Sequence, residues 1–277
     1  MRKAIPIVLA LLMALGIAAC GGTTTDAPNS PSDAPNSPSD APVELIVFAA
    51  ASMTDTLEEI ALLYKDVAPH VTLVYNFDSS GTLKTQIENG ADADLFVSAA
   101  QRQMNELQEL DFVLTDTRIN ILENKVVLVT APDNPANITS FNGLVDALLG
   151  GDILLAIGNS DVPVGQYTIN IFEYFNLDEE ALARSGVLTY GSNVREVTTQ
   201  VRESSVDAGI VYATDAFSTG LDIVDYASAE MSGGQVIYPA AVLNISSNVA
   251  AAQAFLDYLT TPPAMAVFEG VGFSPVR

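Results

Sequence analysis

The sequence predicts an α/β fold of two lobes, each a mainly parallel sheet with flanking helices. Short apolar runs of strand length alternate with segments of helical period, and this alternation begins again after about residue 124. Strands that alternate with helices are typical of parallel sheets with right-handed crossovers. The aliphatic content of residues 43–277 is sufficient for one large domain or two small ones with their own cores.

The first half begins with three apolar runs of strand length, at 45–48, 71–77 and 95–97. After the first run, Leu57, Ile60 and Tyr64 recur at the spacing of one helix face. We expect two further helices, from Ser79 to Ile87 and from Gln101 to Leu110, each directly after a strand. The order strand, helix, strand, helix, strand predicts the first parallel sheet.

The second half repeats this order. Strands are predicted at 126–130, 153–157, 208–212 and 236–243, and helices at 165–176, 194–203, 249–259 and 263–269. We place two strands that cross between the lobes near 122–130 and 236–244. Lobe 1 is then expected to combine about 43–123 with 240–277, and lobe 2 to comprise about 124–239.

The first residues predict export. Arg2 and Lys3 precede an apolar run that has the layout of a secretory signal and is too short to span a bilayer. Cys20 ends a small-residue stretch that resembles a bacterial lipobox. We expect residues 1–19 to be removed and Cys20 to carry a lipid, which would hold the chain at the extracytoplasmic face of a bacterial membrane. An ordinary cleaved signal with an incidental cysteine is the alternative.

Residues 20–42 predict a tether. The unit DAPNSPS occurs twice from Asp26 and then begins a third time. Proline, serine and asparagine at this density cannot bury a core, so the segment is expected to link the anchor to residues 43–277.

The charge and the rare residue types exclude several classes of partner and site. The formal net charge of −23 repels nucleic acid and anionic lipid, so neither is an expected partner. Because Cys20 is the only cysteine, the folded part has no disulfide, no thiol nucleophile and no cysteine metal site. An anion site here must use local donors rather than the overall field.

Four predicted junctions between a strand and a helix carry small residues and hydroxyls where the helix begins. They are Ala51-Ser52-Met53-Thr54, Ser79-Ser80-Gly81-Thr82, Val162-Pro163-Val164-Gly165 and Gly191-Ser192-Asn193-Val194. Free backbone N–H groups and the helix dipole allow a helix start to bind an anion without a cationic side chain. Each serine or asparagine could instead only cap its own helix. Four such junctions, two in each half, indicate a shared anion site between the lobes.

The residues at these junctions resemble those of the periplasmic molybdate-binding protein (ModA) family of ABC-transporter solute-binding proteins. The similarity covers nearly all of 44–273 in the right order. It is carried by Val47–Thr54, Phe77–Leu83, Gln86–Ala91, Ala93–Ala99, Val162–Tyr167, Asn193–Arg195, Gly209–Ala216, Tyr238–Val242 and Gly272–Phe273.

The resemblance implies a type II periplasmic-binding-protein fold, a tetrahedral oxyanion ligand such as molybdate or tungstate, and the membrane permease of an ABC importer as partner. By the same resemblance, the oxyanion would be held by side-chain hydroxyls and backbone N–H groups of Ser52, Ser80, Val164, Val194 and Tyr212. No cofactor is implied, molybdenum would be present only as the bound oxyanion, and a monomer is expected.

Two positions depart from the family pattern. Val164 stands where alanine is common, which a backbone contact tolerates if the side chain points away from the ligand. Asp78 stands where a small residue is common. Pointing inward, Asp78 would repel a dianion and favour an oxyanion with its own proton, such as hydrogen phosphate; pointing outward, it would be a surface acid.

Other classes of function have less support. A Ser–His–Asp triad needs a histidine beside a nucleophile at a strand end, but the only histidine, His70, is expected before the second strand, and there is no G-x-S-x-G turn. A resident metal would depend on scattered carboxylates. We therefore expect no enzyme. Receptors for sulfate or phosphate, and a sensory or adhesive lipoprotein without a ligand, are the remaining alternatives.

Overall fold

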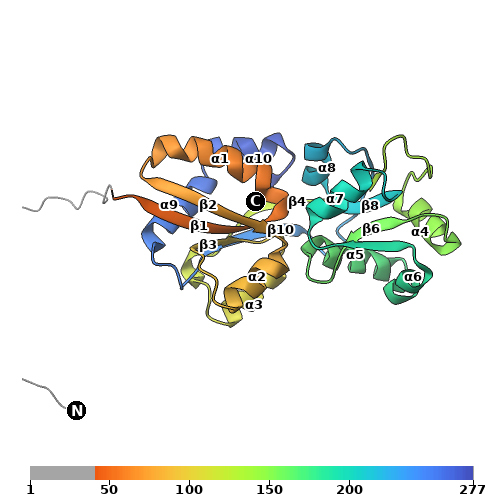
Figure 1. Ribbon diagram of the computed structural model, residues 1–277, viewed down its shortest axis with the longest axis horizontal. Coiled ribbons are helices and arrows are strands. Elements are labelled where there is room, and N and C mark those ends of the chain that lie inside the picture. The colour runs from red at the N-terminus through yellow and green to blue at the C-terminus, as the bar shows by residue number, and fades with distance from the viewer. Residues whose placement is uncertain (1–40, 277) are drawn as a thin grey trace, which may run out of the picture. The chain divides into compact units, whose positions relative to one another are not determined.

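Two sheets organise residues 41–276, the part of the chain that the computed structural model describes. The predicted signal peptide, the predicted lipid site Cys20 and the tether as far as residue 40 lie outside the described residues. We refer to the first sheet and its helices as lobe 1, and to the second sheet and its helices as lobe 2 (Figure 1).

Lobe 1 contains a six-stranded sheet in the order β11-β4-β10-β3-β1-β2. Its strands are β1 (Val43–Ala50), β2 (Val71–Asp78), β3 (Leu95–Val97), β4 (Ile119–Asn124), β10 (Val236–Val242) and β11 (Ser274–Pro275). Its helices are η1 (Ala51–Met53), α1 (Thr54–Val67), α2 (Ser80–Glu88), α3 (Gln101–Glu109), η2 (Thr115–Thr117), α9 (Val249–Leu259) and α10 (Pro262–Gly270).

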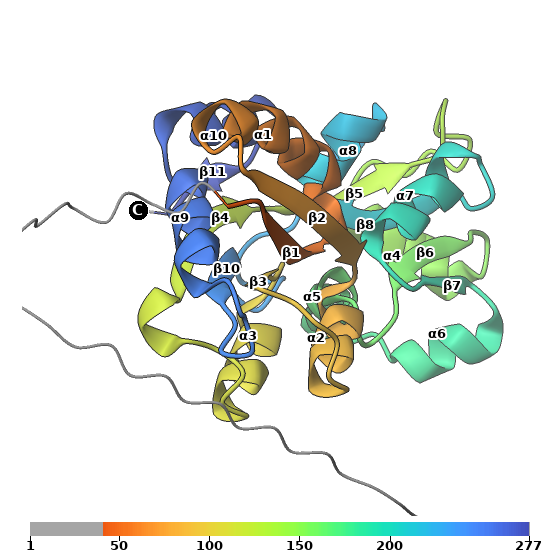
Figure 2. The same ribbon diagram turned by 60° about the vertical axis from the view of Figure 1, so that its left-hand side comes forward.

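The alternation of side chains along β1 explains how helices cover both faces of this sheet. Val47 and Ala49 belong to one core cluster together with residues of α1, α9 and α10, such as Phe255. Phe48 points to the other face and packs in a second cluster with Leu83 of α2 and residues of α3. Figures 1 and 2 accordingly show α1 and α10 on one side of the sheet and α2 and α3 on the other.

Lobe 2 contains a five-stranded sheet in the order β7-β6-β8-β5-β9. Its strands are β5 (Val126–Thr130), β6 (Leu155–Gly158), β7 (Leu188–Gly191), β8 (Ala208–Tyr212) and β9 (Ile223–Tyr226). Its helices are α4 (Phe141–Gly150), α5 (Pro163–Tyr174), α6 (Glu179–Ser185), α7 (Val194–Arg202) and α8 (Ala213–Thr219). The bounds predicted for β3, β5 and β8 are confirmed.

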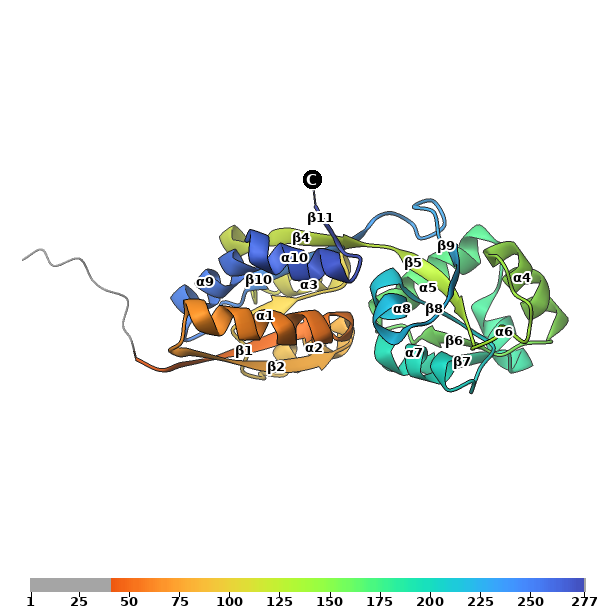
Figure 3. The ribbon, with the colours of Figure 1, turned by 90° about the horizontal axis from the view of Figure 1, so that it is seen from above.

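The chain passes between the lobes twice. It leaves lobe 1 at Lys125, between β4 and β5, and returns through residues 227–235, between β9 and β10 (Figure 3). Among the described strands, β10 pairs only with β3 and β4 of lobe 1. The second crossing between the lobes therefore comes before residues 236–244, the segment in which we expected it.

The two-lobed α/β architecture is confirmed, but each sheet is mixed rather than mainly parallel. In lobe 1, β1 pairs in parallel with β2 and β3, whereas β10 runs antiparallel to β3 and β4. In lobe 2, β6 pairs in parallel with β7 and β8, whereas β5 runs antiparallel to β8 and β9. β5 and β10 are reversed because each enters its sheet from the boundary between the lobes, where the parallel strands end.

None of the helices in residues 41–276 is both long enough and apolar enough to cross a membrane.

Candidate functional site

Each of the five predicted site residues lies at or shortly after the carboxyl end of a parallel strand. Ser52 follows β1, Ser80 follows β2, Val164 follows β6 and Val194 follows β7, while Tyr212 is the last residue of β8. β1 lies between β2 and β3, and β6 lies between β7 and β8, so the winding of each sheet reverses at these strands. The ends of such strands are the usual ligand sites of open α/β sheets.

Helix capping is performed by neighbours of the predicted site residues. Ser79 Oγ caps α2 by accepting the backbone N–H of Thr82 at 3.1 Å, and Asn193 Oδ1 caps α7 by accepting that of Glu196 at 3.1 Å. Ser79 and Asn193 therefore cap their helices, as the alternative interpretation of these junctions expects. Ser52 and Ser80 make other contacts.

The two lobe 1 hydroxyls already have partners in the protein. Ser80 is fully buried, and its Oγ accepts the backbone N–H of Ala99 at 3.0 Å. Ser52 is half-buried, and its Oγ lies 2.9 Å from the hydroxyl of Tyr238. Since Ser80 Oγ acts as an acceptor toward Ala99, its own hydrogen is free to be donated to a ligand.

The lobe 2 contributions of Val164 and Val194 are backbone N–H groups. Both residues lie in the first turn of a helix, α5 and α7 respectively, so their N–H groups have no acceptor within the helix. Pro163 occupies the first position of α5, where its missing N–H costs nothing. The Val164 side chain is fully buried in the hydrophobic core.

Tyr212, the last residue of β8, has a buried hydroxyl without a hydrogen-bond partner. Its side chain is 1% exposed. Burial, followed by the charges of Tyr238, Tyr167 and Asp215, raises the pKa of Tyr212 well above its ordinary value. The hydroxyl therefore stays protonated as a donor, and a buried donor without an acceptor is destabilising unless a bound group supplies one.

Asp78 forms a hydrogen bond between the two lobes. Its Oδ1 accepts the backbone N–H of Ser79 at 2.7 Å and the Nδ2 amide hydrogen of Asn193 at 3.3 Å. The lobes also meet at Gly81 of α2, where an added Cβ would lie 2.2 Å from the carbonyl oxygen of Asp161 in lobe 2. Only a glycine permits this approach.

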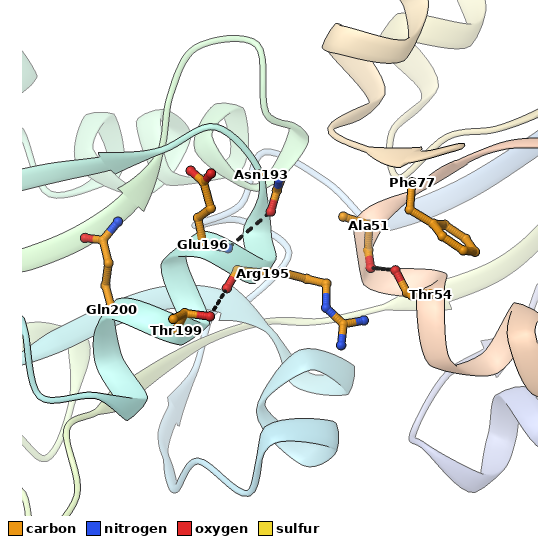
Figure 4. A pocket seen from close by; sticks show the side chains of 8 residues that line it. All are labelled: Ala51, Thr54, Phe77, Asn193, Arg195, Glu196, Thr199 and Gln200. Carbon is orange, nitrogen blue, oxygen red and sulfur yellow. Dashed lines mark hydrogen bonds between the residues drawn. The ribbon is translucent and has the colours of Figure 1, made fainter. Parts of the chain in front are cut away.

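A cavity of about 450 Å³ opens between the lobes beside the predicted site (Figure 4). Its lining residues come from both lobes: Ala51, Thr54, Phe77, Asn193, Arg195, Glu196, Thr199 and Gln200. The side chain of Arg195 extends from α7 toward lobe 1, where it forms an ion pair with Asp55 at 3.2 Å. This partly exposed pair places a cation at the cavity without burying it.

Asp215, in the first turn of α8, is a buried acid behind the site. It is 6% exposed, and its Oδ2 has no hydrogen-bond partner. Burial raises its pKa to about 7, although the charge of Arg195 acts in the opposite direction. Neutral Asp215 is thus favoured below about pH 7 and charged Asp215 above it.

Sequence reasoning did not select Asn124 or Tyr238. Tyr238 lies at the lobe boundary because β10 runs antiparallel to β3 and β4, so its amino end lies toward their carboxyl ends. Asn124 Nδ2 donates to the hydroxyl of Tyr238 at 3.2 Å and to Thr214 Oγ1 of lobe 2 at 2.9 Å. Tyr238 is the first residue of the motif Tyr238–Val242, and this motif could have indicated its role. No motif contains Asn124.

The predicted position of His70 is confirmed, since it lies in the turn before β2, at the opposite end of that strand from Ser80. Within residues 41–276, no group of histidine, cysteine, aspartate and glutamate side chains could hold a metal ion.

Comparisons with known proteins agree with the two-lobed fold. Residues 45–274 match the family model described as bacterial extracellular solute-binding protein. The molybdate-binding protein ModA of Haemophilus influenzae is 35% identical, over 83% of this chain and 90% of its own length. YvgL of Bacillus subtilis, named as a candidate ABC transporter substrate-binding lipoprotein, is 34% identical, over 84% of this chain and 86% of its own.

Among solved structures, the substrate-binding domain of a candidate molybdenum ABC transporter from Clostridium difficile matches with a TM-score of 0.62 and 31% identity. The match covers 85% of this chain and all of that domain.

Proposed function

Because the chain belongs to the bacterial extracellular solute-binding protein family, and within it to the ModA proteins, we propose that it binds molybdate or tungstate between its lobes. It then delivers the oxyanion to the permease of an ABC importer. Ser52, Ser80, Val164, Val194 and Tyr212 supply the donors.

The observation that carries this proposal is the fully buried Tyr212 hydroxyl, which has no partner in the protein. Molybdate at neutral pH is a dianion without protons, so its oxygens accept hydrogen bonds and donate none. The free hydrogen of Ser80 and the first-turn N–H groups of Val164 and Val194 are further donors at the same strand ends. A set that offers donors suits such an anion.

Neutral donors also fit the charge of the protein. A cation buried beside the anion would need desolvation, whereas hydroxyls and backbone N–H groups bind an anion without it. The formal net charge of −23 makes the long-range field unfavourable, so recognition depends on these short-range contacts.

Closure of the lobes is the mechanism that we assign to capture. The pairs Asp78–Asn193 and Asp55–Arg195 and the close approach of Gly81 to Asp161 are contacts that separation of the lobes would break. Because each lobe supplies part of the donor set, only the closed form satisfies the whole ligand, and ligand binding shifts the equilibrium toward closure.

We propose that the protein acts at a membrane surface. Cleavage before Cys20 and its lipidation would place the protein at the extracytoplasmic face of a bacterial membrane, beside the permease. The word lipoprotein in the name of YvgL supports this assignment. We expect the receptor to act as a monomer.

Calorimetric titration tests the function. The purified protein from residue 43 onward, which includes all described strands and helices, is titrated with molybdate, tungstate, sulfate and phosphate. We expect tight one-to-one binding of the first two and no heat from the others. Binding of sulfate or phosphate alone would identify a different oxyanion as the substrate. If the folded protein binds none of the four anions, the receptor assignment is wrong.

A further inference from the structure

The Ser52 hydroxyl is connected to the segment that joins the lobes by a chain of two hydrogen bonds. Asn124, the last residue of β4, donates to Tyr238, and the Tyr238 hydroxyl lies 2.9 Å from Ser52 Oγ. We call this chain the Asn124–Tyr238–Ser52 relay. Figure 3 shows β4 leading directly into β5 of the other lobe.

The orientation of the Asn124 amide is determined by its surroundings. Its Oδ1 accepts the backbone N–H of Lys125 at 2.8 Å, and that group can only donate. The Nδ2 atom therefore faces the other way, and its two hydrogens go to Thr214 Oγ1 and to the hydroxyl of Tyr238. Asn124 is 8% exposed, so water does not compete freely for these contacts.

This orientation determines the direction of the second hydrogen bond. The Tyr238 oxygen already accepts a hydrogen from Asn124, and its own hydrogen needs an acceptor because Tyr238 is fully buried. Ser52 Oγ is the acceptor within reach. Tyr238 thus donates to Ser52, and the Ser52 hydrogen remains free to point at a ligand.

We propose that Asn124 and Tyr238 are positioning residues that hold the Ser52 hydroxyl as a donor, and that this polarity selects fully ionised oxyanions over protonated ones. The inference rests on the proposed function, because Ser52 must contact the oxyanion. Molybdate accepts the Ser52 hydrogen. Hydrogen phosphate carries a proton that needs an acceptor, and the relay presents it with a second donor instead, so it leaves a buried polar group unpaired.

The substitution Asn124→Asp reverses the relay. A carboxylate at position 124 accepts the Tyr238 hydrogen, Tyr238 then accepts the Ser52 hydrogen, and Ser52 presents a lone pair to the ligand. We expect the molybdate affinity of this variant to fall by about tenfold or more, as for the loss of one hydrogen bond to a charged group. The affinity for hydrogen phosphate should fall less or rise.

The new carboxylate also adds a charge, and a double-mutant cycle separates this effect from the relay. With Tyr238→Phe the relay is interrupted, so Asn124→Asp can act on the ligand only through its charge. We expect Asn124→Asp to lower molybdate affinity much less in the Tyr238→Phe background than in the wild type. Asn120→Asp, the same change at an exposed position of β4, controls for charge on lobe 1.

Titrations with molybdate and phosphate, with a thermal unfolding curve for each variant, decide the matter. An effect of Asn124→Asp that is equal in both backgrounds, or no change in the ratio of molybdate to phosphate affinity, would overturn the relay. These results leave the proposed function standing if the wild type binds molybdate. A wild type that does not bind molybdate refutes the proposed function, and the relay's role in selectivity with it.

Discussion

The two halves of the candidate site differ in how their donors are held. In lobe 1, Ser52 and Ser80 are side-chain donors whose oxygens already have partners, Tyr238 and the Ala99 N–H. In lobe 2, Tyr212 has no partner, and the other donors are main-chain groups at two helix starts. In the proposed site, lobe 1 thus provides a preorganised half, whereas lobe 2 provides a half that a ligand would complete.

The Val164 N–H of lobe 2 is positioned by close packing, because no side-chain hydrogen bond caps the start of α5. At Gly165, an added Cβ would lie 2.3 Å from the carbonyl oxygen of Asn159 and 2.4 Å from that of Gly158. The start of α5 therefore packs directly against the loop that follows β6, and this contact places the Val164 N–H. A helix start held in this way needs no charged residue to bind an anion.

We expect the largest effects on molybdate affinity from Tyr212→Phe and Ser80→Ala, one variant in each lobe. Both variants lose a hydrogen bond to a charged ligand, so molybdate affinity should fall about tenfold to a hundredfold in each. Their stabilities without ligand should diverge. Tyr212→Phe removes an unpaired buried hydroxyl and should not destabilise the protein, whereas Ser80→Ala leaves the Ala99 N–H without its acceptor and should cost about 1–3 kcal/mol.

Denaturant unfolding without ligand and calorimetry with molybdate provide the two measurements. Equal destabilisation of the ligand-free protein by both variants would contradict the difference between the lobes. Unchanged affinity in Tyr212→Phe would remove Tyr212 from the site.

A smaller effect is expected from Gly81→Ala, which acts on closure and leaves every donor in place. The new methyl group would occupy the space of the Asp161 carbonyl oxygen and keep the lobes apart, so molybdate affinity should fall about tenfold. Gly270→Ala is the matched control, because it also lies in a helix and its added Cβ would meet nothing within 4 Å. Wild-type affinity in Gly81→Ala would show that binding does not need this approach.

The strands and helices that build the site were accessible from the sequence because their signals are local. Strands β3, β5 and β8 have the predicted bounds, and the helix starts at Ser80 and Val194 lie where small and polar residues predicted them. The missed elements have weaker signals. For example, β7 has only four residues with mixed exposure, and α8 begins directly after β8 without a loop.

The contacts between sequence-distant residues were not accessible. The sequence near Asn124 does not indicate that this residue contacts Tyr238 and Thr214. The orientation of Asp78 could not be predicted either, because it depends on the position of Asn193 in the other lobe. We expected residues 236–244 to cross between the lobes, but that expectation did not indicate that Tyr238 would contact Asn124 and Ser52. The identity of the donors could thus be predicted, but not the network that orients them.

The smallest expected effect is a pH dependence due to Asp215, the lobe 2 acid with an unpaired oxygen. Its pKa is raised to about 7, so the folded protein holds a proton that the unfolded chain releases, and stability should decline as pH rises toward 7. Above that pH the charged carboxylate repels a dianion, and its field reaches both Tyr212 and Tyr238. Molybdate affinity should therefore fall several-fold between about pH 6.5 and 8.5.

Asp215→Asn should make affinity nearly independent of pH over this range and should remove the Asp215 contribution to the decline of stability below pH 7, since the amide does not titrate. Asp66→Asn removes an exposed carboxylate of α1 and should retain the slope of the wild type. Calorimetric titration at several pH values measures this slope for the three proteins. If Asp215→Asn keeps the wild-type slope, the pH dependence of affinity comes from another group. Tyr212 would then be the one unpaired group of lobe 2 with a role in binding.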